Sequence, residues 1–325
     1  MDKKELNPEL INQVKKLEEK YAVMGQDLSS YLDGLLYSEY LTYWDYIHLD
    51  TLLSLQTPKT NFPDEQVFIM YHQITELYFK MVLFEIEQIA DHKSLTEKFF
   101  IERLDRINCY FKNLENSFTI MVEGMEKEQF LKFRMALLPA SGFQSAQYRL
   151  IEICSTNLIN LISINERSTV SAKSSIEELL EKLYWRSGAT ELKSGKKTLT
   201  LQQFEAKYNK SFLNIAKDYA SKNLYKIFNE KFPDSSELVS RLREFDLLAN
   251  VFWPLAHMKS AGRYLHKDPE DIKATGGTNW QKYLPPRFQK VIFFPKIWSE
   301  KEKEEWGKAA VLKILAEAMV NRPNV

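Results

Sequence analysis

The chain has 325 residues, of which 44% are hydrophobic and 13% aromatic, which is enough to build a large core. Forty-four basic side chains balance forty-four acidic ones, so net charge gives no reason to expect nucleic acid or an anionic membrane as a partner. No apolar run approaches the roughly 20 residues that a membrane-spanning helix needs, and the first residues do not read as a signal peptide. We therefore expect a cytoplasmic protein with a small, local site.

Sparse glycine and proline, 10 and 11 residues, favour long helices over many short strands. The spacing of apolar residues predicts helices near 8–34, 64–90, 95–124, 127–162, 174–186, 201–230, 235–265 and 299–320. Helix-start patterns that pair a capping side chain with a glutamate three residues later occur at Ser94/Glu97, Ser175/Glu178, Asp234/Glu237 and Ser299/Glu302. The expected fold class is all-α, without a sheet.

Two stretches interrupt the helical pattern. Residues 166–200 are rich in Ser, Thr and Lys, which predicts a surface excursion carrying a short helix. Proline pairs in 285–295 forbid a continuous helix and predict an extended segment laid over the core.

His72 lies in the helix predicted at 64–90, among aromatic residues. At about 100° per residue it shares one side with Glu76, while Phe68 and Phe79 flank it. An isolated histidine in such surroundings is most often a hydrogen-bonded structural residue. The functional alternative is a proton handler or ligand in an aromatic pocket.

No two of the five histidines stand at a ligand spacing on one helix, so the sequence gives little support to a zinc or di-iron site. A haem iron needs no such pair, because the porphyrin supplies four of its ligands. His257, in a helix dense in Leu, Phe and Trp, is then as interesting as His72. Composition alone does not separate a ligand from a core histidine.

Arg134 stands in mostly apolar surroundings and needs a carboxylate partner there. Either an internal glutamate or a substrate carboxylate would serve. The Gly-Gly pair of 273–280, with Thr275 beside it, would let backbone amides approach a ligand, although an ordinary flexible loop looks the same.

Five stretches, in this order along the chain, resemble the tryptophan 2,3-dioxygenase family of haem enzymes. They are YWDYIHLDTLLSLQ (43–56), DEQVFIMYHQITELYFK (64–80), FRMALLPASGFQSAQYRLIE (133–152), WPLAHMKSAGR (253–263) and TGGTNWQKYL (275–284). The resemblance implies an elongated, all-α helical bundle of the tryptophan 2,3-dioxygenase and indoleamine dioxygenase type. It also implies one haem b per subunit.

For the haem side of the site, the resemblance implies that His257 is the proximal ligand of the iron. His72 becomes the distal, catalytic histidine near the indole N–H. Ser141 and Gly142 correspond to the pair placed beside the haem.

For the substrate, the resemblance implies that Phe68 lines the indole pocket and that Arg134 pairs with the amino acid's carboxylate, with Leu137 as an apolar neighbour. Thr275 would contact the ammonium and carboxylate end. Phe130 stands where the family usually has a tyrosine, so one hydroxyl is missing. Pro254 replaces an arginine that is common after Trp253.

The N-terminal residues also match. Tyr43, Tyr46 and Ile47 correspond to a segment that reaches into a neighbouring subunit's pocket in the family, which implies a homotetramer. We expect a single helical domain over 1–325, whose first 55 residues or so pack on a neighbouring subunit.

The activity implied is cleavage of the indole C2–C3 bond of L-tryptophan with O2, giving N-formylkynurenine, at the start of the kynurenine route of tryptophan catabolism. One alternative is a haem-dependent monooxygenase that hydroxylates tryptophan or another aromatic amino acid on the same scaffold. Another is a helical haem-binding protein without catalytic activity.

Overall fold

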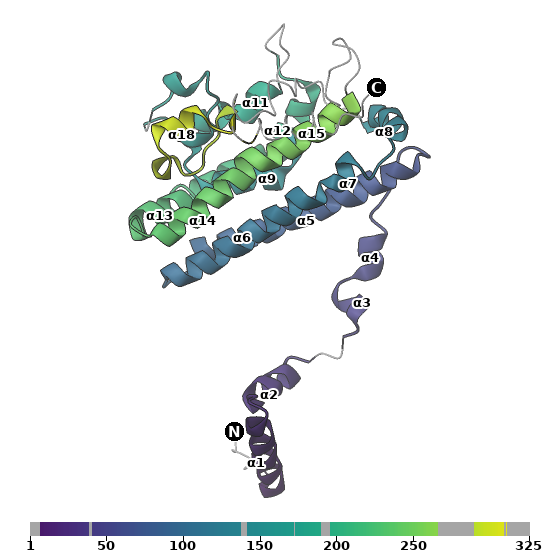
Figure 1. Ribbon diagram of the computed structural model, residues 1–325, viewed down its shortest axis with the longest axis vertical. Coiled ribbons are helices and arrows are strands. Elements are labelled where there is room, and N and C mark those ends of the chain that lie inside the picture. The colour runs from purple at the N-terminus through teal and green to yellow at the C-terminus, as the bar shows by residue number, and fades with distance from the viewer. Residues whose placement is uncertain are drawn as a thin grey trace, which may run out of the picture. The chain divides into compact units, whose positions relative to one another are not determined.

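The computed structural model describes residues 7–38, 41–137, 142–171, 173–189, 196–265, 289–308 and 310. These residues form helices and connecting turns, and no strand occurs among them (Figure 1). The α-helices are α1 (Pro8–Val23), α2 (Leu28–Leu36), α3 (Tyr43–Tyr46), α4 (Leu49–Leu53), α5 (Pro63–Ala90), α6 (Glu97–Ser117), α7 (Thr119–Val122), α8 (Lys127–Phe133), α9 (Ala146–Ser155), α10 (Ile176–Glu181), α11 (Tyr184–Gly188), α12 (Leu199–Asp218), α13 (Leu224–Lys231), α14 (Ser236–Leu247), α15 (Trp253–Leu265) and α18 (Glu300–Glu304). Shorter 3-10 turns are η1 (Arg134–Leu137), η2 (Gly142–Gln144), η3 (Leu158–Leu161), η4 (Arg167–Thr169) and η6 (Pro295–Ile297), and η5 (Leu248–Phe252) is a π-helix. The expected all-α class is confirmed.

The chain divides into two units, Met1–Gln56 and Thr57–Val325. The first unit contains α1 to α4 and has almost no core of its own. Leu28 is its one buried side chain among the described residues, whereas Leu35, Leu36, Tyr37 and many other large apolar side chains are exposed. This unit therefore presents apolar surface that its own helices leave uncovered.

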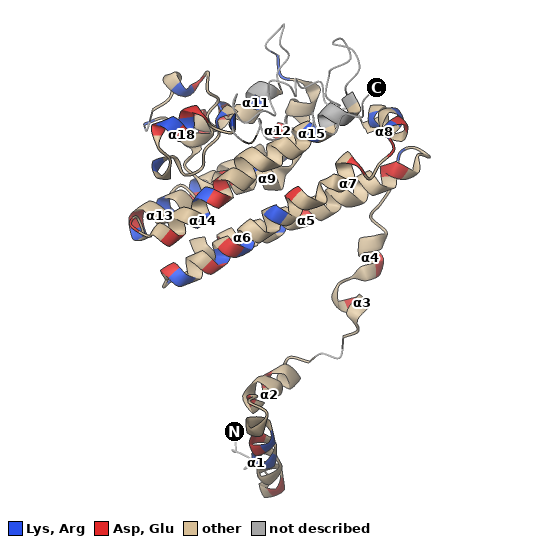
Figure 2. Cartoon of the chain, in the orientation of Figure 1, with Lys and Arg blue, Asp and Glu red and all other residues tan. Residues whose placement is uncertain are grey.

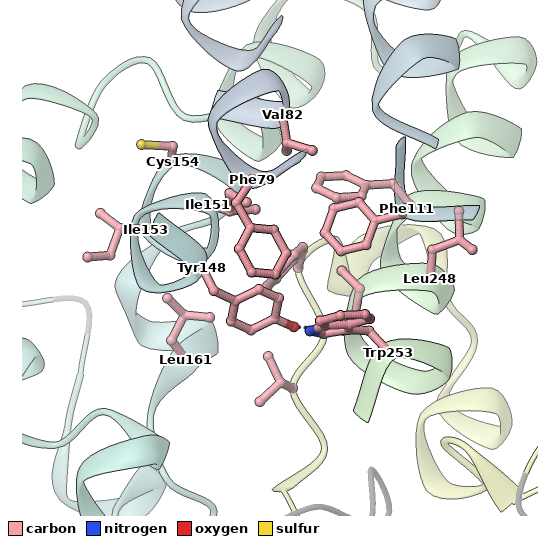
Figure 3. Close-up of a cluster of buried hydrophobic side chains, with 14 of the residues drawn as sticks. Phe79, Val82, Phe111, Tyr148, Ile151, Ile153, Cys154, Leu161, Leu248 and Trp253 are labelled. Carbon is pink, nitrogen blue, oxygen red and sulfur yellow. Dashed lines mark hydrogen bonds between the residues drawn. The ribbon is translucent and has the colours of Figure 1, made fainter. Parts of the chain in front are cut away.

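The second unit is built around two long neighbouring helices, α5 and α6. Helix α14 packs on α6, and α9 packs on α5 (Figure 1). Their inward faces meet in one large cluster, where the ring of Phe79 lies 5.3 Å from that of Tyr148 and 5.8 Å from that of Trp253 (Figure 3). Through Phe79, Tyr148 and Trp253, α5, α9 and α15 thus contact one another at this point of the core.

The long helices expected at 64–90, 95–124 and 235–265 are confirmed as α5, as α6 with α7, and as the continuous run from α14 to α15. Five expected helices are wrong because they are broken. Residues 174–186 are interrupted between α10 and α11. Residues 8–34 turn at Gly25, which has a φ of +65° that favours glycine, 127–162 contain short turns between α8 and α9, and 201–230 break after Asp218. In 299–320, α18 ends at Glu304 and a turn follows at 305–307, where Gly307 has a φ of +72°.

Two of the expected helix starts are confirmed, at Ser175 and at Ser299, which forms a full capping box with Glu302. The other two are wrong by one or two residues. Thr96 accepts from the Phe99 amide instead of Ser94, and Ser235 accepts from the Leu238 amide instead of Asp234. The segment predicted as an excursion at 166–200 also contributes to the core, where Leu183 and Trp185 are buried.

Acidic and basic residues are mixed along α1, α6 and α14 (Figure 2). No helix within the described ranges has both the length and the hydropathy needed to cross a membrane.

A buried carboxylate holds the chain after Lys290 against the end of α14. Asp246 accepts hydrogen bonds from the backbone amides of Phe293 (2.9 Å) and Phe294 (3.2 Å), from the indole N–H of Trp298 (2.9 Å) and from the Asn250 side chain (2.8 Å). Burial raises the pKa of Asp246 to about 6, even though these four donors favour the ionised form. The described part of the predicted extended segment is thereby fixed to α14 and to the π-helix.

We predict that Asp246→Ala lowers the free energy of unfolding by about 3 kcal/mol or more, because it leaves several buried donors without an acceptor. Urea unfolding followed by circular dichroism measures this. Asp218→Asn is the matched control: this exposed carboxylate pairs with Lys222 at 2.9 Å, and its loss should change stability by no more than about 0.5 kcal/mol. Equal effects of the two changes would contradict the role assigned to Asp246.

Candidate active site

Helix α5 presents His72 with a fixed ring orientation. The ring atom Nδ1 lies 2.7 Å from the carbonyl oxygen of Phe68, one turn earlier. A carbonyl can only accept, so Nδ1 carries the hydrogen and Nε2 keeps its lone pair. The rings of Phe68 and His72 lie 4.1 Å apart, which holds the imidazole from the side.

The His72 side chain is accessible to solvent, yet the protein atoms around it desolvate the imidazole and lower its pKa. The hydrogen bond to Phe68 and the negative charge of Glu76 act in the opposite direction. The net lowering favours the neutral imidazole at pH 7, with Nε2 as an acceptor.

His257 lies just beyond an irregular stretch of backbone. In the π-helix η5 the amide of Trp253 donates to the carbonyl of Leu248, five residues earlier. The next donor in that register would be residue 254, pointing toward the Ala249 carbonyl. Pro254 has no N–H, and the hydroxyl of Tyr148 donates to the Ala249 carbonyl instead, at 2.7 Å. The proline is thus accommodated without leaving this buried carbonyl unsatisfied.

The imidazole of His257 repeats the arrangement at His72. Its Nδ1 lies 2.9 Å from the carbonyl oxygen of Trp253, so Nε2 again keeps its lone pair. The rings of Phe118 and Trp253 each lie 4.5 Å from the imidazole and hold it on two sides. Burial, with a contribution from the charge of His72, lowers the pKa of His257 to about 4. The two histidines, 185 residues apart in sequence, are connected by aromatic rings: Tyr71 lies 6.3 Å from His72 and 5.8 Å from Phe118, which packs on His257.

Aromatic side chains form a wall around Phe68. The rings of Phe130 and Phe133 lie 6.2 Å and 5.6 Å from the Phe68 ring, and the Tyr264 ring lies 4.4 Å from that of Phe130. The Tyr264 hydroxyl donates to backbone carbonyls, with Val122 and Met125 each at 3.3 Å. The wall near Phe130 is consequently apolar.

Phe118, Phe133 and Tyr264 were not anticipated from the sequence. Each sits among many other apolar residues at ordinary helical spacing, so no local pattern distinguishes them from the rest of the core.

The remaining predicted site residues follow α8. Arg134 and Leu137 are both half-buried in the 3-10 turn η1, directly after Phe133. Gly142 begins the turn η2, where a Cβ atom would meet no other atom within 4 Å. Ser141 and Thr275 lie outside the described residues.

Tyr43, Tyr46 and Ile47 belong to the first unit. Tyr43 and Tyr46 are exposed at the ends of the short helix α3, and Ile47 follows it, half-buried. Their predicted place in a neighbouring subunit's pocket stays a prediction.

A cavity of about 420 Å³ opens one turn along α5 from His72. Its lining includes Glu76 from α5, Gln144 and Gln147 around the start of α9, and Tyr208 from α12. The Gln147 amide donates to both the side chain (2.9 Å) and the backbone carbonyl (2.7 Å) of Glu76. This double contact fixes α9 against α5 next to the turn that bears His72.

The residues on the His257 side fit a haem iron. One neutral imidazole, with Nδ1 fixed by a carbonyl and Nε2 available, is the protein ligand that a porphyrin-bound iron needs. No cluster of three His, Cys, Asp or Glu side chains occurs among the described residues. An iron that brings its own four nitrogen ligands needs no such cluster.

Comparison with known proteins gives a consistent result. A family model described as tryptophan 2,3-dioxygenase matches residues 34–267. The tryptophan 2,3-dioxygenase of Ruegeria sp. (strain TM1040) is 27% identical over 277 residues, covering 81% of this chain and 92% of that protein. That of Herpetosiphon aurantiacus is 29% identical over 265 residues, covering 81% and 98%. Over a shorter stretch of 126 residues, the protein of the same name from Anopheles gambiae is 40% identical, covering 37% of this chain and 31% of its own.

Proposed function

Because this chain belongs to the tryptophan 2,3-dioxygenase family, we propose that it cleaves the C2–C3 bond of the indole of L-tryptophan with O2. The product is N-formylkynurenine, the start of tryptophan catabolism by the kynurenine route. The indole double bond breaks and each of its two carbons gains one oxygen atom, so no external reductant is consumed. The observation that carries the proposal is the pair of imidazoles, His72 and His257, each with Nδ1 on a backbone carbonyl and with the rings of Tyr71 and Phe118 between them.

We propose one haem b per subunit, which His257 would hold through a bond from Nε2 to the iron. When bound, haem supplies the iron at which O2 is activated. Because the Nδ1 hydrogen of His257 goes to the Trp253 carbonyl, the ring cannot turn freely and presents Nε2 in one direction. The rings of Phe118 and Trp253 hold the imidazole in this orientation. Ser141 and Gly142 are proposed to lie beside the haem.

Toward the substrate, His72 is proposed to act through Nε2. As an acceptor, this atom suits the indole N–H of the substrate, which is a donor. Phe68, stacked at 4.1 Å, fixes the imidazole and offers its own ring to the indole. The apolar wall at Phe130 and Phe133 excludes water from the reacting carbons.

The amino acid end of the substrate needs a charged partner. Arg134, half-buried next to the aromatic wall, is proposed to pair with the carboxylate, with Leu137 beside it and Thr275 at the ammonium end. A guanidinium can bind a carboxylate through two hydrogen bonds, which orients the substrate as well as holding it. The indole ring would thereby be held in one orientation beside Phe68 and His72.

The exposed apolar surface of Met1–Gln56 supports a further part of the proposal. Tyr43, Tyr46 and Ile47 are proposed to enter the pocket of a neighbouring subunit in a homotetramer. Helices with so little core of their own need another surface to cover them. A cytoplasmic location remains a prediction.

Product analysis tests the reaction. We expect the reduced, haem-loaded protein, given L-tryptophan and ¹⁸O2, to form N-formylkynurenine with two labelled oxygen atoms, as measured by mass spectrometry. A product with one labelled atom would instead support a monooxygenase. Haem binding without any indole product would support the non-catalytic alternative.

His257→Ala tests the axial ligand. We expect the Soret band of the haem-loaded variant to shift or disappear, since the iron loses its protein ligand. His92→Ala is the matched control, because the His92 ring packs against Phe99 (4.4 Å), away from the proposed site. An unchanged Soret band in His257→Ala would overturn the assignment.

Arg134→Ala should raise the KM for L-tryptophan and also lower kcat, together reducing kcat/KM by about 100-fold or more, because a charge-assisted pair both binds and orients the substrate. Steady-state kinetics measures both constants. Lys132→Ala removes an exposed cation from the same end of α8 and should leave them within about twofold. An Arg134→Ala variant as active as Lys132→Ala would place the carboxylate partner elsewhere.

A further inference from the structure

The cavity that opens one turn after His72 has no part in the proposed reaction. It has a volume of about 420 Å³ and is lined from α5, α9 and α12. None of its lining residues is proposed to hold haem or L-tryptophan. Small-molecule sites in proteins have volumes of roughly 300 to 1,000 Å³. The cavity is therefore large enough for a ligand of modest size.

Glu76 and Gln147 leave two oxygen atoms of this cavity without a donor. The amide nitrogen of Gln147 donates to Oε2 of Glu76 (2.9 Å) and to the Glu76 backbone carbonyl (2.7 Å), which uses both of its hydrogens. Oε1 of Glu76 and the side-chain oxygen of Gln147 accept no hydrogen bond from the described part of the chain. The hydroxyls of Tyr208 and Ser211, also in the lining, have no partner there either. The polar side of the cavity thus offers several acceptors.

The carboxylate of Glu76 gives the cavity a negative charge. No Lys, Arg or His is among the lining residues, and none of the residues that the structure describes forms an ion pair with Glu76. The ammonium of Lys207 lies 5.2 Å from the centre of the Tyr208 ring without lining the cavity. A cavity with a carboxylate and no cation of its own favours a positively charged ligand.

The rest of the lining is largely apolar and partly aromatic. Leu150 belongs to α9, and the ring of Phe212, on α12, is stacked with that of Tyr208, with centroids 6.0 Å apart and planes at 25°. Phe212 is 1% exposed, so its packing in the core holds this wall in place. Such a wall suits the apolar part of a ligand, an aromatic ring above all.

We propose that this cavity binds a primary amine that carries an aromatic group. The ammonium is placed at Oε1 of Glu76 and the side-chain oxygen of Gln147, and the aromatic group on Leu150 and Phe212. A primary ammonium has three N–H donors and no acceptor, which matches a carboxylate with neighbouring acceptors. An acid of the same shape would bring a second negative charge to Glu76, and a neutral alcohol would lack the charge-assisted bond. This site lies beyond the proposed function and does not depend on it.

Calorimetric titration of the haem-loaded, ferric protein with 2-phenylethylamine tests this site. We expect one amine per chain, with a dissociation constant at least about tenfold lower than that of 2-phenylethanol, which has the same skeleton without the charge. Glu76→Gln should weaken the binding of the amine at least about tenfold. Glu237→Gln is the matched control, because this carboxylate lies outside the cavity and pairs with Arg241 at 3.1 Å. Its effect should stay within about twofold.

Ser211→Trp tests the position of the site independently of its charge. Ser211 is exposed on α12, so an indole there can block the cavity while the helix keeps its buried face. We expect amine binding to be lost, with circular dichroism and haem content unchanged.

Three results would overturn the proposal. The first is an amine affinity in Glu76→Gln or in a folded Ser211→Trp variant equal to that of the wild type. The second is no binding by the wild type at millimolar amine. The third is a Soret shift that persists in Glu76→Gln, which would place the amine at the haem. None of these measurements uses turnover, so this site and the proposed function fail separately.

Discussion

The carboxylate of Asp246 accepts hydrogen bonds from two backbone amides, an indole and an amide side chain, all within the interior. These bonds connect the end of α14 with residues 293–298 and with Asn250 in the π-helix. The course of the chain into α15, and hence the place of His257, follows from them. The hydroxyl of Tyr148 completes the connection from α9, because it takes the carbonyl that Pro254 cannot serve. Asp246 and Tyr148 thus help to position His257, although neither side chain contacts it.

Helix content and the longest helices followed from apolar spacing, because α5, α6 and α14 each have a face large enough to dominate their pattern. The breaks in 127–162 did not follow from apolar spacing, although the sequence carries a signal for them: Pro139, which disfavours a helix interior, stands between Arg134–Leu137 and Gly142–Gln144. Likewise, the resemblance named His72 and His257, whereas Phe118, which packs against the His257 ring, comes from a helix end whose sequence resembles any other part of the core. The site is assembled by packing between segments far apart in the chain, which no local pattern records.

Both imidazoles reach the same state by the same local means. Each donates its Nδ1 hydrogen to the carbonyl four residues earlier on its own helix, and each loses basicity to its surroundings. A backbone acceptor requires no particular side chain at that position, which explains why the sequence carries no second residue type paired with either histidine. The helix backbone supplies the hydrogen-bond acceptor, so the neighbouring side chains can be aromatic. The surroundings of both histidines can therefore be apolar while their ring nitrogens stay fixed.

The first unit, with a single buried apolar side chain among its described residues, has a consequence for how the protein behaves on dilution. A segment that gains its apolar contacts from another copy is ordered only to the extent that copies associate, so its order follows mass action. Under the proposed assembly, concentration acts on the folding of the first unit but not on the body of the chain, which has its own core. At low concentration the two units would lose structure at different points, and the chain would no longer unfold as one cooperative body.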